Sequence, residues 1–231
     1  MGASFDPQQS AEFDAYAHRY DDLHKASIAA SGEDPAYFAV YKQRTLERLL
    51  GRSFSAPVLD FGCGIGNLTR LLVESFPTVH GYDPSSSSAK LAAERAPKAR
   101  FFDAVDALPR GGYGAVVVAN VLHHVPPAER AALLATLHDV LAPGGRVIVF
   151  EHNPLNPVTR RAVAACPFDE NAELLWPWEV KRLLRGAKLA SIALDYIVFF
   201  PRALAGMRGL EPSLGWLPLG AQVCAWGTKA G

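Results

Sequence analysis

Cysteine is scarce in this 231-residue chain, which has three cysteines and two methionines. Cys63, Cys166 and Cys224 are odd in number and far apart in the sequence. This pattern excludes a disulfide framework and a Cys-x-x-Cys metal or redox site. We therefore expect a reducing compartment and no metal site.

Neither sign of charge is in excess, because 23 Lys and Arg residues balance 23 Asp and Glu residues. Such a chain has no global field to hold a nucleic acid or an anionic membrane. The longest apolar runs, around residues 116–119, 147–150 and 197–200, fall far short of the roughly 18 residues of a membrane-spanning helix. Residues 1–10 have neither the basic start nor the apolar run of an export signal. We expect a soluble, cytoplasmic protein that acts on a small molecule, with no nucleic-acid or membrane partner and with its oligomeric state left open.

Short β-prone runs alternate with segments of helical periodicity between residues 51 and 150. The predicted strands are residues 58–61, 79–82, 100–102, 115–119 and 147–150. The predicted helices are residues 67–75, residues 85–96 and a segment that opens at Pro126-Pro127. Alternation of this kind indicates an α/β, Rossmann-like, doubly wound sheet. With 49% hydrophobic residues, the chain has the apolar material for one such domain.

The flanking segments differ from this core. Aromatic residues at helical spacing and the pair Asp34-Pro35 predict two helices within residues 1–50. After Glu151 we expect a Pro- and Asn-rich connection as far as Asn171, a helix near 177–187 and a strand at 192–200. A Gly- and Pro-rich stretch and a last strand at 223–228 complete the chain. The single domain, residues 1–231, thus divides at 1–50, 51–150 and 151–231.

A glycine-rich loop joins the first predicted strand to the helix that follows. It reads Asp60-Phe61-Gly62-Cys63-Gly64-Ile65-Gly66. Glycines at this place let a ligand approach the backbone N–H groups at the carboxyl end of a strand. Asn67 stands where a dinucleotide fingerprint has its third glycine, so a nicotinamide-dependent oxidoreductase is the less favoured alternative. Asp83 closes the second strand, where a carboxylate can accept hydrogen bonds from both hydroxyls of a ribose.

These residues resemble the class I S-adenosylmethionine-dependent methyltransferases of the small-molecule type. The resemblance runs from about Leu49 to Phe150 and includes the glycine loop and the acid after the second strand. His123-His124 and the segment 141–145, Leu-Ala-Pro-Gly-Gly, also match. It implies a seven-stranded sheet with the last strand antiparallel. It also implies that residues 1–50 form a helical lid, 51–150 bind the cofactor, and 151–231 supply a substrate loop and the final strands.

The resemblance also implies roles in holding S-adenosylmethionine, whose product is S-adenosylhomocysteine. The loop glycines would pack against the methionine and ribose portions, Asp60 would support the amino group, and Asp83 would hold the ribose. Asp103 would accept from the adenine amine, the Ala104 N–H would meet the ring, and the Asn120 carbonyl would face the ammonium. The full set is Asp60, Gly62, Cys63, Gly64, Gly66, Asp83, Pro84, Asp103, Ala104, Asn120 and Tyr20 of the lid. Asp103 is displaced by one position from the family's usual acid, so Asp106 stays open as the adenine partner.

Three histidines follow the fourth and fifth strands, at the sheet edge where the cofactor would lie. Histidine titrates near neutrality, so His123 and His152 are candidate general bases. The alternative is that they only shape the pocket. His124, Tyr16 and Asn153 are candidate contacts for the acceptor. The predicted function is in-line transfer of the methyl group to oxygen, nitrogen or carbon of a small, natural-product-like molecule. A non-methylating member that keeps the cofactor pocket is the alternative.

Overall fold

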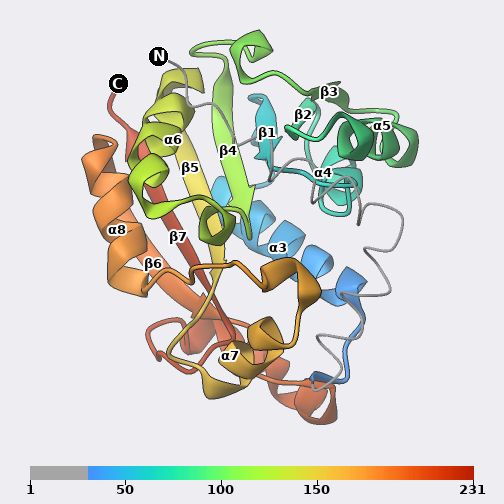
Figure 1. Cartoon of the computed structure of the whole chain (residues 1–231), viewed down its shortest axis with the longest axis vertical. Coiled ribbons are helices and arrows are strands. Elements are labelled where there is room, and N and C mark those ends of the chain that lie inside the picture. Colours follow the sequence, from blue (N-terminus) through green and yellow to red (C-terminus); the bar gives the residue numbers. More distant parts are fainter. Residues whose placement is uncertain (1–30) are drawn as a thin grey trace.

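A seven-stranded sheet with the order β3-β2-β1-β4-β5-β7-β6 forms the centre of the computed structural model, which describes residues 31–231 (Figure 1). β7 runs antiparallel to both of its neighbours, and the other strand pairs are parallel. The strands are β1 (Val58–Phe61), β2 (Val79–Tyr82), β3 (Arg100–Phe102), β4 (Tyr113–Ala119), β5 (Leu141–His152), β6 (Leu189–Ile197) and β7 (Gln222–Lys229). The predicted α/β fold with an antiparallel last strand is confirmed.

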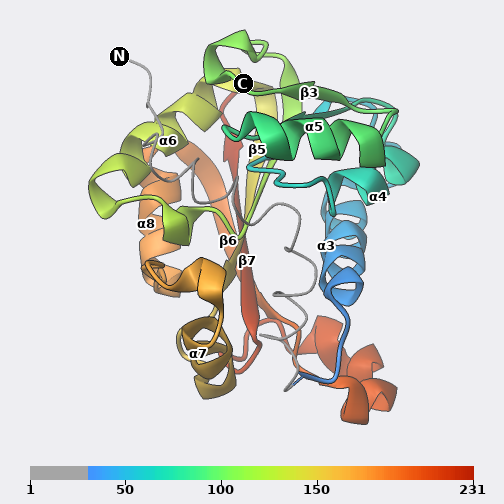
Figure 2. The ribbon, with the colours of Figure 1, turned by 45° about the vertical axis from the view of Figure 1, so that its right-hand side comes forward.

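Helices cover both faces of the sheet, so that the domain has three layers (Figure 2). The first face packs against α3 (Pro35–Leu50) and α4 (Thr69–Ser75), through Leu46 and Leu72, and α5 (Ser86–Arg95) lies beside α4. The second face packs against α6 (Pro127–Val140) and α8 (Pro177–Gly186), through Leu134 and Leu184. Both cores are apolar and combine aliphatic with aromatic side chains, and the central strands, buried on both faces, are continuous apolar runs in the sequence.

Two predicted helix starts are confirmed by their caps. The Asp34 side chain accepts from the Ala36 N–H at 2.9 Å, with Pro35 at the first helical position of α3. The Ser85 hydroxyl accepts from the Ser88 N–H at 3.0 Å at the start of α5. Each cap satisfies a backbone donor that the helix itself leaves unpaired.

The carboxyl-terminal third departs from the sequence prediction in two places. β6 ends at Ile197 rather than at residue 200, because Val198 adopts a φ of 62° that an extended strand cannot continue. The next two N–H groups, of Phe199 and Phe200, then donate to Glu211 Oε1. The connection after Glu151 also contains α7 (Pro157–Ala164), capped by the Asn156 side chain.

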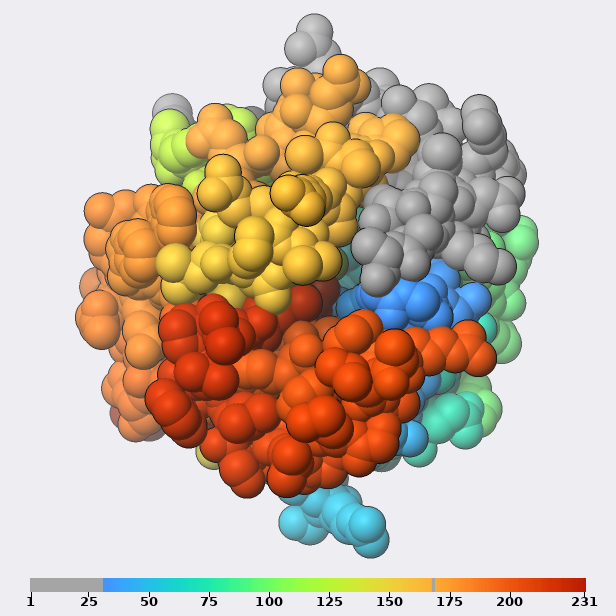
Figure 3. Space-filling view, turned by 90° about the horizontal axis from the view of Figure 1, so that it is seen from below, coloured from blue at the N-terminus to red at the C-terminus, as the bar shows by residue number. Residues whose placement is uncertain are grey.

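Short 3₁₀ helices complete the description: η2 (Val105–Ala107), η3 (Leu122–His124), η4 (Pro167–Asp169) and η5 (Arg202–Ser213). Seen from the end toward which β4 points, α7 and η5 cover much of the face (Figure 3). This is the edge at which the parallel strands end. Within residues 31–231, no helix combines the length and the apolarity that crossing a membrane requires.

Candidate active site

The candidate site lies where the strand order reverses. From β1 the order runs through β2 to β3 on one side, and β4 pairs with the other side, with Phe61 opposite Val118. In open α/β sheets, ligands bind outside the carboxyl ends of the strands at such a switch point. The segment that leaves β1 here is the glycine loop, residues 62–68.

The glycine loop packs tightly against a neighbouring segment at Gly62 and has free space beside its backbone at Gly64. Gly62 has a φ of 74°, and a Cβ there would lie 2.5 Å from Cγ2 of Val121, so no other residue fits without a shift. Gly64 has a φ of 52°, and none of the described atoms outside its chain neighbours comes within 4 Å of a Cβ built there. The loop therefore packs against the segment after β4, and a ligand can approach its backbone at Gly64.

Two acidic side chains hold the two ends of the loop in place through hydrogen bonds. Asp83 Oδ2 accepts from the Gly64 N–H at 2.7 Å, and Oδ1 accepts from the Ser85 N–H at 3.0 Å. Asp60 is buried and accepts from Thr69 Oγ1 at 2.7 Å, and burial raises the pKa of its carboxyl to about 6. Asp60 thus ties β1 to the start of α4. Asp83, predicted from the sequence as the ribose partner, joins β2 to the loop.

Asn120 follows β4 with a φ of 58°, a left-handed conformation that asparagine adopts more readily than most residues. Its N–H donates to the Phe150 carbonyl at 2.8 Å. Its side-chain Oδ1 is buried and has no hydrogen-bond partner among residues 31–231. An unpartnered, buried acceptor beside the glycine loop is the kind of group that a ligand with N–H donors would satisfy.

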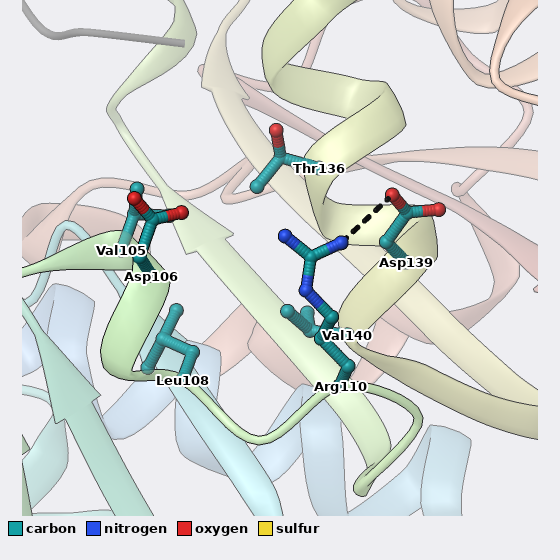
Figure 4. A pocket seen from close by; sticks show the side chains of 7 residues that line it. All are labelled: Val105, Asp106, Leu108, Arg110, Thr136, Asp139 and Val140. Atoms are coloured by element: carbon teal, nitrogen blue, oxygen red, sulfur yellow. Dashed lines mark ion pairs between the residues drawn. The ribbon is translucent and has the colours of Figure 1, made fainter. Parts of the chain in front are cut away.

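The two acids proposed for the adenine lie in different surroundings. Asp103 and Ala104 are exposed and come directly after β3. Asp106, on η2, lines a pocket with Arg110 and Asp139, whose side chains lie 3.8 Å apart (Figure 4). Arg110 precedes β4, so this pocket extends toward the edge opposite the glycine loop. Both acids are exposed, and the choice of Asp103 or Asp106 as the adenine partner stays a prediction.

Three histidines and two carboxylates converge at the ends of β4 and β5. His123 Nδ1 lies 2.5 Å from Glu151 Oε2, and its Nε2 lies 3.4 Å from Asp169 Oδ1. His124 Nε2 lies 3.5 Å from the same Asp169 oxygen. The His152 ring centroid is 5.1 Å from that of His123. We call these five residues the histidine–carboxylate cluster. Their elements are η3, β5 and η4.

The cluster perturbs the pKa of each of its members. Burial alone would lower the pKa of His123, but the carboxylates of Glu151 and Asp169 outweigh it and raise that pKa to about 9. Burial and the positive charge of His123 lower the pKa of His124 to about 4 and that of His152 to about 3. Burial would raise the pKa values of Glu151 and Asp169. The interaction with His123 lowers both pKa values by more than burial raises them, and that of Asp169 falls to about 2. His123 therefore keeps its proton at neutral pH, which makes the predicted role as a proton acceptor hard to fill unaided.

Buried hydrogen bonds hold the cluster's backbone. The Arg130 Nε donates to the carbonyls of Leu122 and Val125, and one of its terminal nitrogens donates to the Glu173 carbonyl at 2.9 Å. Glu151 Oε1 accepts from the Leu122 N–H at 2.7 Å. A guanidinium on α6 thus fixes η3 and the segment after η4 together, which presets the histidine geometry.

Asn153 is buried but has a structural role in this fold. Its Nδ2 donates to the carbonyls of Pro218 and Gly220, at 3.2 and 2.7 Å, and its Oδ1 accepts from the Leu155 N–H. These bonds use both amide N–H donors and one lone pair of the oxygen to pin the connection after β5 to the segment before β7. The predicted contact of Asn153 with the acceptor stays a prediction.

Other predicted residues fall into three groups. Cys63 is buried, and burial raises the pKa of its thiol well above the usual value, so it can serve a ligand only through its backbone. Pro84 follows Asp83 directly and is partly buried. Tyr16 and Tyr20 lie outside the described residues.

Sequence reasoning missed three charged residues. Glu151 and Asp169 carry no motif of their own, although Glu151 precedes the predicted His152 and Asp169 lies in the polar connection. The third, Lys42, is buried on α3, on a helical face that otherwise reads as apolar core. Burial lowers the pKa of its amine to about 8, while Glu151 and Asp60 partly restore it. No carboxylate of the described residues lies within ion-pair distance of Lys42.

The fold and the glycine loop define the class, and comparisons with known proteins define the family. A family model described as a methyltransferase domain matches residues 35–192. An uncharacterized methyltransferase of Bacillus thuringiensis (strain Al Hakam) is 32% identical over 154 residues, which cover 64% of this chain and 67% of that protein. A Bacillus mycoides (strain KBAB4) protein with the same description matches equally well.

Solved structures share the fold at lower identity. A SAM-dependent methyltransferase from Thermotoga maritima gives a TM-score of 0.69 at 16% identity, covering 96% of this chain and 99% of that one. One from Archaeoglobus fulgidus gives 0.64 at 14% identity, covering 83% and 94%.

The Rossmann-like sheet with its antiparallel last strand is the class I methyltransferase fold. The chain belongs to the methyltransferase-domain family and is an S-adenosylmethionine-dependent methyltransferase. The residues fit the cofactor: the loop is open at Gly64, Asp83 lies at the end of β2, and the buried Asn120 Oδ1 needs a donor.

Proposed function

We propose that this methyltransferase acts on a small molecule and methylates an oxygen or nitrogen atom that carries an exchangeable proton. The observation that carries the proposal is the histidine–carboxylate cluster, which follows β4 and β5 beside the glycine loop. Of the oxygen, nitrogen and carbon targets expected from the sequence, a polar, proton-bearing atom suits this lining best. Gly62 packs on Val121, two residues before His123, so the cluster adjoins the loop that would hold the cofactor's methionine end.

The bound cofactor supplies an activated methyl group on a sulfonium. The chain's residues then have two tasks. The loop, Asp83 and Asn120 fix the donor, and Asp103 with the Ala104 N–H would hold its adenine. The cluster holds the acceptor in line and excludes water, which together supply much of the rate in a displacement of this kind. His124, expected from the sequence to contact the acceptor, has a side chain that is 20% exposed, so an acceptor could reach it.

A small-molecule acceptor also fits the surfaces that cover the site. α7 and the segment 213–221 are tied together over the strand ends, by Asn156 Nδ2 to the Leu219 carbonyl at 2.7 Å and by Thr159 Oγ1 to the Ala221 carbonyl at 3.0 Å. Segments tied over the strand ends in this way would restrict a folded protein or a nucleic-acid duplex more than a small molecule.

The test is to incubate the protein with methyl-labelled S-adenosylmethionine and, separately, the small-molecule, protein and nucleic-acid fractions of a cell extract. We expect label in the small-molecule fraction, formation of S-adenosylhomocysteine, and a product heavier by one methyl group on oxygen or nitrogen. Asp83→Asn should lower the labelling at a subsaturating cofactor concentration, and the surface variant Asp139→Asn should keep it. Label confined to protein or nucleic acid would contradict the acceptor class.

A further inference from the structure

We infer that His123, His124 and Asp169 form a binding site for one divalent cation of the zinc type. Their ligand atoms lie within 4.8 Å of one another and come from two elements, η3 and η4, and Arg130 ties η3 to the segment that follows η4. The inference rests on the proposed function only for the chemistry that the ion would perform.

The two distances from Asp169 to the histidines suit metal ligation. Asp169 Oδ1 lies 3.4 Å from His123 Nε2 and 3.5 Å from His124 Nε2. Both separations exceed the 2.7–3.2 Å of ordinary N–H···O bonds. Ligand atoms bonded to Zn²⁺ at about 2.0–2.1 Å in a tetrahedron lie roughly 3.3–3.4 Å from one another, which is close to what Asp169 shows toward both histidines.

Glu151 supplies the outer contact that such a site requires. Metal-bound histidines almost always donate their other ring nitrogen to a carboxylate or a carbonyl. Here His123 Nδ1 lies 2.5 Å from Glu151 Oε2, which leaves Nε2 directed toward Asp169. Glu151 is itself fixed by the Leu122 N–H. The pair therefore sets the tautomer that presents the Nε2 lone pair to an ion.

Charge favours the same conclusion. Glu151 and Asp169 bring two negative charges into surroundings where their side chains are 1% and 11% exposed. A divalent ion at this site would compensate both charges, and any proton on His123 Nε2 would pass to solvent as the ion binds.

Three protein ligands leave a fourth position open, as in catalytic rather than structural zinc sites. The acceptor's hydroxyl can bind there through its oxygen and release its proton to water, because the ion lowers the pKa of that hydroxyl. A lone pair of that atom then attacks the methyl carbon. The carbon–sulfur bond breaks with its electron pair remaining on sulfur, and S-adenosylhomocysteine leaves.

The experiment is a titration of chelator-treated, full-length protein with Co²⁺, whose visible absorption reports four-coordinate geometry, followed by competition with Zn²⁺. We expect one Co²⁺ per chain, displaced by one Zn²⁺. Asp169→Asn and His124→Gln should weaken binding at least 100-fold, and Glu151→Gln about 10–100-fold. Matched controls are His138→Gln and Asp139→Asn, which alter a surface His–Asp pair 3.8 Å apart and should leave binding unchanged. Circular dichroism checks that each variant folds.

The proposed site would be overturned if the wild type showed no saturable binding of Co²⁺. It would also be overturned if Asp169→Asn bound Co²⁺ as tightly as the wild type. The two proposals fail separately. If metal-free protein methylates its acceptor at the full rate, the proposed chemistry of the ion is wrong and the methyl transfer stands. If the ion binds but no small molecule is ever methylated, the acceptor class is wrong and the site stands.

Discussion

Replacing Lys42 by methionine should stabilise this protein at neutral pH. The Lys42 side chain is buried on α3 without an ion-pair partner among the described residues, and burial lowers its pKa from 10.5 to about 8. At about 1.4 kcal/mol per pKa unit, keeping the charged form folded costs about 3 kcal/mol. Methionine has similar length and no charge, so Lys42→Met should gain on the order of 1–3 kcal/mol at pH 7.

The sign of the pH dependence follows from the two pKa values. Between pH 8 and 10.5 the unfolded chain binds the Lys42 proton and the folded chain does not, so this residue makes wild-type stability rise with pH across that window. Below pH 8 the Lys42 amine is protonated in both the folded and the unfolded chain, so the folded state bears the full free-energy cost of the buried charge. Lys42→Met removes this contribution. The difference in free energy of unfolding between variant and wild type should therefore shrink as the pH rises from 8 to 10.

The assay is urea unfolding followed by tryptophan fluorescence at pH 7, 8, 9 and 10. The difference between wild type and variant cancels the other groups that titrate at alkaline pH. Lys90→Met, at an exposed position on α5, is the matched control and should change stability by less than about 0.5 kcal/mol. A Lys42→Met protein that is less stable at pH 7 and has the wild-type pH slope would show that the buried charge is compensated and refute the reasoning.

Three further outcomes test the loop and the connection after β5. Asp83→Asn should weaken cofactor binding by calorimetry about tenfold or more, because it removes charge-assisted bonds from the loop; unchanged affinity would refute the assignment. Gly62→Ala should destabilise the fold by about 1–3 kcal/mol in thermal unfolding, and Val121→Ala should recover part of the loss if the 2.5 Å clash is its cause. Asn153→Ala should lower the free energy of unfolding by about 1–3 kcal/mol and leave cofactor affinity unchanged; a reversed pattern would restore its predicted ligand role.

The cofactor half of the site could be predicted from sequence because its parts are local. A strand, a glycine loop and a helix follow one another within residues 58–75, and the acid that supports the loop closes the next strand. Parallel neighbours bring their carboxyl ends to one edge, so Asp83 must come near Gly64. The glycine spacing thus carries both the local turn and its place in the sheet.

The part of the site formed by the histidine–carboxylate cluster could not be predicted, because it depends on contacts between residues far apart in the sequence. His123 and Glu151 are 28 residues apart and meet because β4 and β5 pair in parallel. Asp169 reaches them from η4, in a connection whose periodicity predicts no structure. The end of β6 likewise depends on Glu211, which accepts the N–H groups that a longer strand would have used. Side chains distant in sequence decide each of these features.

The buried charges of this protein gather at one edge of the sheet, and their cost indicates where selection has acted on function rather than stability. Lys42 is buried at a cost in free energy, and the pKa values of the buried Glu151 and Asp169 are lowered chiefly by His123. A fold with two apolar cores needs none of these groups to be stable, since apolar side chains of equal volume would often pack at least as well. Residues that lower stability and converge beside the cofactor loop are therefore the ones to change when the acceptor is sought.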